Sequence, residues 1–164
     1  MTEPTGYSRP QIRLHWIVAL LIVPQFVLHD GISAAWRALG QGQELPALDP
    51  LVPLHVLGGV LIAALVLWRI VLRSRRAAPA LPEAEHPALK FVAKLTHAGL
   101  YALLLGLPLS GAAAWFGGVR AAGDAHEVMK TLLLALVALH VAGALYHQFV
   151  LKDGLMQRMK RAAP

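Results

Sequence analysis

Four long stretches of this chain carry no charged side chain, and they restrict its fold more than any other feature. They cover residues 14–29, 50–68, 95–119 and 131–151. Each is close to the roughly 17–25 residues with which an α-helix crosses a bilayer. Little of the 164-residue chain is then left for a soluble domain. We therefore predict an all-α fold, a single transmembrane four-helix bundle that occupies residues 1–164.

Local signals place the ends of these helices. Pro10 fits the first turn of the first helix, Asp124 is a reasonable N-cap for the fourth, and Pro108 predicts a kink in the third. A short surface helix is expected near 34–39, and a linker rich in proline and alanine near 77–87. The four spans are expected at approximately 10–29, 53–73, 88–115 and 124–151.

The first apolar stretch also has features of a cleaved signal peptide. Arg9 and Arg13 precede it, and the small residues 33–35 follow it. Cleavage would remove His15 and leave three spans, so we favour four retained helices.

Lysines and arginines gather at the two termini and in the loop between the second and third helices. Loops rich in these residues stay on the cytoplasmic side. We therefore predict that both termini are cytoplasmic. The formal net charge of +6 follows from this topology and from contacts with lipid head groups, and does not indicate nucleic-acid binding.

Six of the eight histidines are candidate functional residues, because an ionisable side chain within a membrane span is costly and usually functional. His126 and His140 are fourteen residues apart, so they share a helix face and are separated by roughly 21 Å. His55 and His126 each lie two residues into a predicted helix that starts at the periplasmic face. These two rings are therefore expected at one shallow depth.

The cytoplasmic half holds the remaining histidines, and depth alone does not pair them. His15 could face either His140 or His147, and His97 lies in the same half. Two imidazoles on opposite sides of a haem iron favour electron transfer over oxygen binding. The chain has no cysteine, which excludes covalent haem attachment, so any haem is of the b type.

Other residues near these histidines have two interpretations. Gly58 and Gly59 follow His55 by one turn, and they either leave a flat face for a macrocycle or permit close helix packing. Arg69 is fourteen residues after His55, on the same face. It is a candidate partner for a haem propionate, or else it reaches lipid phosphate.

A set of short motifs spread from Tyr7 to about Met159 resembles the bacterial cytochrome b561 family. The motifs are Tyr7-Ser8-Arg9 with Gln11, His15-Trp16, His55 with Gly58-Gly59, His97, Leu107-Pro108, Ser110-Gly111, His126-Glu127, His140, His147 and Lys152-Asp153. The resemblance implies a four-helix protein of the bacterial inner membrane with two b haems in its core. It implies His55 with His126 as axial ligands of the periplasmic haem, and His15 with His140 as those of the cytoplasmic haem.

The resemblance also implies a function. Some members oxidise superoxide at the periplasmic face and reduce ubiquinone, which would make this chain an oxidoreductase. An electron-relay module between a partner redox protein and quinone is the alternative, and a homo-oligomer is compatible with either. A histidine-lined transporter for metal or protons is a third interpretation, which the lack of carboxylates in the charge-free stretches disfavours.

Two further sites are expected from what remains. His97 and His147 would bind a quinone head near the cytoplasmic surface, between the third and fourth helices, because imidazole can donate hydrogen bonds and protons. The alternative is that these two histidines bond each other or stabilise the loops. Lys130, one turn after His126, would join Arg120 in steering superoxide to the periplasmic haem. Lys130 has two alternative partners, a haem propionate and Glu127. No catalytic residue is assigned beyond Lys130.

Overall fold

The computed structural model describes residues 6–43, 49–76, 78–79 and 85–163, and these residues form helices and connecting segments without any β-strand. The helices are α1 (Arg9–Val27), α2 (Asp30–Gly40), α3 (Leu51–Arg75), α4 (Pro87–Trp115) and α5 (Arg120–Tyr146). A π-helical turn (His147–Leu151) and a 3-10 helix (Leu155–Met159) follow α5. The predicted all-α bundle is confirmed.

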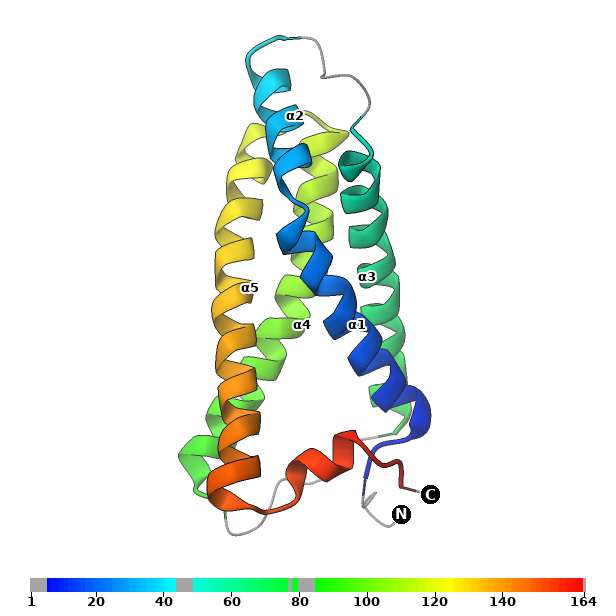
Figure 1. Ribbon diagram of the computed structural model, residues 1–164, viewed down its shortest axis with the longest axis vertical. Helices are drawn as coiled ribbons and strands as arrows, with labels where there is room; N and C mark the ends of the chain where they lie inside the picture. The colour runs from blue at the N-terminus through cyan, green and yellow to red at the C-terminus, as the bar shows by residue number, and fades with distance from the viewer. Residues whose placement is uncertain (1–5, 44–48, 77, 80–84, 164) are drawn as a thin grey trace.

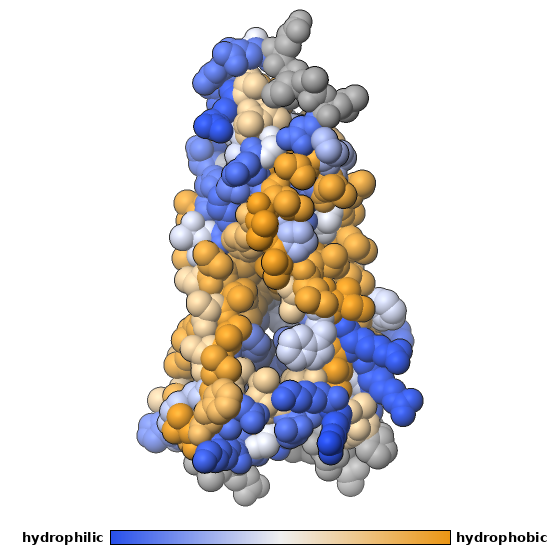
Figure 2. Space-filling model, in the orientation of Figure 1, coloured by the Kyte–Doolittle hydropathy of each residue, from blue (hydrophilic) through white to orange (hydrophobic). Residues whose placement is uncertain are grey.

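Four of these helices are long and apolar enough to cross a membrane: α1, α3, α4, and α5 with its π-helical turn. They run between two ends of the molecule (Figure 1), and both termini lie at one of them, which we call the terminal end. Helix α2 lies at the other, the α2 end. On the face that Figure 2 shows, hydrophobic side chains predominate between these ends, and hydrophilic ones gather at both. The protein is therefore an integral membrane protein.

The helix boundaries differ from the sequence prediction mainly at two places, the start of α5 and the extent of α2. Helix α5 begins at Arg120, so Val119 is its N-cap and the prediction for Asp124 was wrong. His126 consequently lies about one turn deeper in its helix than expected. Helix α2 is longer than the predicted 34–39 and starts directly after α1. Of the predicted linker at 77–87, residues 77 and 80–84 lie outside the described residues.

Helix α2 is fixed against the start of α5. A Cβ atom added to Gly123 would lie 2.9 Å from the Trp36 ring, so glycine allows these helices to approach. Arg120 Nη2 also donates a hydrogen bond of 3.2 Å to the carbonyl oxygen of Gly40, at the C-terminus of α2. These contacts give Arg120 a structural partner and place α2 across the end of the bundle.

The interior between α1, α3 and α4 is packed by aliphatic side chains. Val18, Ile62 and Val66 are buried together, with Tyr101 and Leu104 from α4 against them. Helix α1 starts at a capping box, in which the Ser8 amide donates to Gln11 Oε1 at 2.9 Å, and Pro10 lies in its first turn. This start and the packed centre hold His15 facing the interior, and the candidate site is built around such inward-facing histidines.

Candidate functional site

His55 on α3 and His126 on α5 face each other near the α2 end, with ring centroids 6.3 Å apart. A cavity opens beside them, and all five α-helices contribute to its lining. Besides the two rings it is lined by His29, Trp36, Gly59, Gly111 and Lys130, among others. The two histidines are thus the facing polar groups of a largely apolar cavity.

The ring of His126 is held in one orientation by helix α4. The Leu107 carbonyl oxygen lies 3.0 Å from His126 Nδ1, and the Ser110 hydroxyl lies 3.1 Å from the same atom. A carbonyl only accepts, so Nδ1 carries the hydrogen and Nε2 keeps its lone pair. Such a backbone partner is what orients histidine ligands in metal sites. Gly111 allows this arrangement, because a Cβ atom there would lie 3.2 Å from the ring.

The two glycines that follow His55 have different surroundings in the structure. A Cβ atom on Gly59 would meet nothing within 4 Å, and Gly59 lines the cavity. One on Gly58 would collide with the Gln25 amide of α1. Gly59 therefore keeps this face of α3 open, and Gly58 permits helix packing. His55 Nδ1 is buried without a hydrogen-bond partner among the described residues.

Three histidines meet nearer the terminal end. The ring centroids of His15 and His140 are 6.0 Å apart, and those of His97 and His140 are 5.1 Å apart. His97 Nδ1 donates to the Ala93 carbonyl oxygen of its own helix at 2.6 Å. His147 does not belong to this group, and its contacts are different.

The ring separations can be compared with what an iron between two imidazoles needs. A histidine nitrogen binds a metal ion at about 2 Å, and adding about 1 Å from nitrogen to ring centre on each side gives a separation of about 6 Å. The separations of 6.3 Å for His55–His126 and 6.0 Å for His15–His140 fit this value. The 5.1 Å of His97–His140 is too short.

Similarity to known proteins identifies the family of this chain. Residues 6–162 match the family model of prokaryotic cytochrome b561. This chain belongs to the prokaryotic cytochrome b561 family. It is 35% identical to a protein named cytochrome b562 from Cereibacter sphaeroides, over 98% of this chain and 99% of that protein. A probable superoxide oxidase CybB from Yersinia pestis is 29% identical, over 93% and 94% of the two chains. Cytochrome b561 homolog 1 of Escherichia coli K12 is 25% identical, over 93% and 96%.

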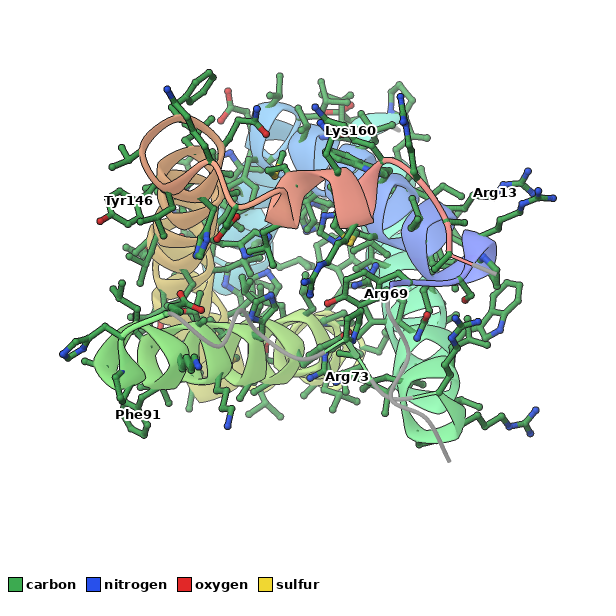
Figure 3. The ribbon with its side chains drawn as sticks, turned by 90° about the horizontal axis from the view of Figure 1, so that it is seen from below. Arg13, Arg69, Arg73, Phe91, Tyr146 and Lys160 are labelled. Carbon is green, nitrogen blue, oxygen red and sulfur yellow. The ribbon has the colours of Figure 1, made fainter. Side chains whose placement is uncertain are left out.

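Membership of the cytochrome b561 family makes the chain a membrane electron-transfer protein and implies haem b as its cofactor. Arg69 of α3 lies near the His15 and His140 rings. Its guanidinium donates to the Gln11 carbonyl oxygen and to the Tyr101 hydroxyl, both at 3.5 Å. Figure 3 shows Arg69 towards the middle of the bundle, whereas Arg13 points outward.

His147 lies in a different environment from His97, which changes the pair proposed for quinone. His147 Nε2 is 3.2 Å from Glu85 Oε1, and Nδ1 is 2.6 Å from Asp153 Oδ2. Burial acts to raise the pKa of Asp153, but hydrogen bonds from the Leu155 amide and from His147 outweigh it and lower that pKa. Both ring nitrogens of His147 are engaged. Sequence reasoning missed Glu85, because a glutamate in a proline- and alanine-rich linker carries no signal that it is buried.

The cations expected to steer superoxide have partners within the cytochrome. Lys130 Nζ lies 2.5 Å from Glu127 Oε2, one of the two partners expected for it. Arg120 contacts the C-terminus of α2. His29, a cavity-lining residue that sequence reasoning also missed, lies 3.4 Å from Asp30 Oδ1. Its position as the last residue of the first apolar stretch was the only available signal. Positive charge at the α2 end is therefore largely compensated.

Proposed function

We propose that the chain holds two b haems, one between His55 and His126 and one between His15 and His140, and moves electrons between them across the membrane. The observation that carries this proposal is the separation of the two ring pairs, 6.3 and 6.0 Å, at opposite ends of the bundle. A bis-histidine haem supplies a one-electron carrier that does not bind oxygen. His140 follows His126 by fourteen positions, so the two proposed sites would lie roughly 21 Å apart, near opposite surfaces.

The proposed direction runs from the α2 end, on the periplasmic side, to the terminal end, on the cytoplasmic side. The distribution of lysine and arginine supports this orientation in a bacterial inner membrane. Superoxide is the proposed donor, in line with the name of the Yersinia pestis relative. Each superoxide would lose one electron and leave as oxygen, and two such electrons with two protons would convert one ubiquinone to ubiquinol.

Quinone is proposed to bind between α4 and α5 at the terminal end. His97 lies beside His140 there, so a head group near His97 would be close to the second haem. The proposed role of His147 changes from direct binding to a supporting one, because two carboxylates already engage its nitrogens.

Stopped-flow spectroscopy of the purified protein tests this function. The absorbance of reduced haem should rise on mixing with superoxide and fall again when ubiquinone is added. Superoxide dismutase should abolish the first phase. Haems that respond to dithionite but not to superoxide would contradict the proposed donor, and reduced haems that ubiquinone leaves unchanged would contradict the proposed acceptor.

The Lys130–Glu127 ion pair favours a second candidate, in which a partner redox protein replaces superoxide as donor. The pair reduces the net positive charge that would attract a small anion. An electron-relay module of this kind would have no small-molecule donor of its own, and it would share the same haems and quinone site.

Reversal of the charge at Lys130 distinguishes the two donors. We expect Lys130→Glu to slow haem reduction by superoxide severalfold, because it places two carboxylates beside the cavity and repels the anion. Arg37→Glu is the matched control, since Arg37 is at the same end but does not line the cavity. The rate should fall less in the control. Equal rates in Lys130→Glu and the parent, without any dependence on ionic strength, would favour the protein donor.

Arg69 should tune the potential of one haem. We expect Arg69→Gln to lower the midpoint potential of the haem at the terminal end by on the order of tens of millivolts, because a nearby positive charge favours the reduced form. Arg75→Gln, at the exposed C-terminus of α3, is the control and should leave both potentials unchanged. A redox titration followed by visible absorbance measures both. Equal potentials in Arg69→Gln and the parent would place Arg69 away from the haem.

A further inference from the structure

Glu85 is a carboxylate in an unusual position. It lies just before α4 at the terminal end, and its side chain is only 2% exposed. One oxygen, Oε1, is 3.2 Å from His147 Nε2, while Oε2 is buried without a partner among the described residues. A buried carboxylate with one unpaired oxygen is costly, which makes Glu85 a candidate functional residue.

Glu85 is linked to the surface through two further groups. His147 has an 11% exposed side chain, and its Nδ1 lies 2.6 Å from Asp153 Oδ2. The Asp153 side chain is 19% exposed, and Asp153 Oδ1 accepts a hydrogen bond from the Leu155 amide. This amide fixes Asp153 in the turn that follows the π-helical end of α5. The three side chains therefore form a continuous line from solvent into the protein.

A proton can move along these three side chains without a change in their total charge. Two hydrogen bonds on one imidazole require two protons, one on each side. With both on His147, the ring is a cation between two carboxylates. With one on Glu85, the ring and Glu85 are neutral and Asp153 is charged. The three side chains together carry a net charge of −1 in both arrangements. Transfer of the proton from Nε2 to Oε1 therefore leaves the net charge of the group unchanged.

We propose that Asp153, His147 and Glu85 form a proton relay, which delivers protons from the surface of the terminal end to the quinone head between α4 and α5. This inference rests on the proposed reduction of quinone. His147, the first residue of the π-helical turn, lies seven residues beyond His140 and roughly 10 Å nearer the terminal surface. The middle member of the relay therefore lies between His140 and the surface from which a quinone would take its protons.

Protons and electrons balance for each quinone that is reduced. Two electrons arrive one at a time from the haem, and Glu85 gives a proton to a quinone oxygen after each. In each transfer an O–H bond of Glu85 breaks and an O–H bond of the quinol forms. Glu85 then takes the Nε2 proton of His147, and His147 regains one from water on the side of Asp153. Two protons leave the solvent for every ubiquinol formed.

The test compares two electron acceptors with the haems reduced beforehand. Ubiquinone needs protons, whereas ferricyanide takes electrons alone. In Glu85→Gln, which keeps the shape and removes the acid, we expect re-oxidation of the haems by a soluble ubiquinone analogue to slow at least tenfold. Re-oxidation by ferricyanide should keep the parent rate. Glu85→Asp should recover part of the ubiquinone rate, because it restores a carboxylic acid.

Matched variants distinguish proton delivery by Glu85 from a purely structural role of its side chain. Asp30→Asn makes the same chemical change at the 94% exposed Asp30 of the α2 end, and it should leave both rates unchanged. A parent protein that ubiquinone does not re-oxidise would overturn the proposed function itself. A reactive parent with equal ubiquinone rates in Glu85→Gln would overturn the relay alone. Slower haem re-oxidation of Glu85→Gln by both ubiquinone and ferricyanide would show a structural role of Glu85 and overturn the relay. Loss of haem from both Glu85→Gln and Glu85→Asp would do the same.

Discussion

Replacement of His126 by alanine is expected to remove one haem and to spare the other, and His55→Ala should give the same result. His15→Ala and His140→Ala should each remove the second haem and spare the first. The physical reason is that each iron would lose one of two axial ligands, while the other pair lies roughly 21 Å away along α5. Haem per polypeptide and the reduced spectrum of each purified variant measure the effect.

The control for these four variants is a histidine outside both pairs. His147→Ala removes an imidazole that directly follows the helix of His126 and His140, and it should retain both haems. Equal haem loss from all four ligand variants, with helical content preserved, would contradict the assignment of two separate pairs. Retention of both haems in any one of the four would show that another residue supplies that ligand.

The second large effect is expected at Gly111, which touches no haem in the proposal. A Cβ atom there would lie 3.2 Å from Cε1 of His126, and the ring cannot yield, because Leu107 and Ser110 hold its Nδ1. Gly111→Ala should therefore displace the ring. We expect the affinity for the haem at the α2 end to fall by about 10–100-fold, as when partners that orient metal ligands are removed.

Gly106→Ala on the same helix is the matched control. A Cβ atom at Gly106 would lie 3.1 Å from the Met129 sulfur, which belongs to a flexible side chain that can move aside. Haem titration of the two variants should show weakened binding in Gly111→Ala alone. Similar affinity in both would mean that the His126 ring tolerates displacement, and that its partners on α4 do not define the site.

Much of the fold could be predicted from the sequence, because exclusion of charge from the membrane is a strong and local signal. The start of α5 was the exception. Asp124 is a good N-cap residue by itself, but Gly118 forms a turn with positive φ before it, and the contacts of Arg120 and Gly123 with α2 extend the helix backwards. Tertiary contacts decided that boundary, and they are not visible in local sequence.

Part of the candidate site could also be predicted from the sequence. Spacing along one helix is set by helix geometry, so the facing of His55 and His126 followed from sequence together with the depth of each span. The different environments of His97 and His147 did not follow. They depend on the burial of Glu85, whose linker approaches α5 only in the folded chain. The Lys130–Glu127 pair was one of two local options that helix spacing alone could not decide.

The number of haems bound by the intact chain tests the central proposal most directly. The protein is purified from the membrane, and its haem is quantified as the pyridine haemochrome against the polypeptide concentration. Two b haems per polypeptide are expected, both reducible by dithionite. One haem per polypeptide, or none after growth with sufficient haem, would contradict the proposal of two histidine-ligated sites that carry electrons across the membrane.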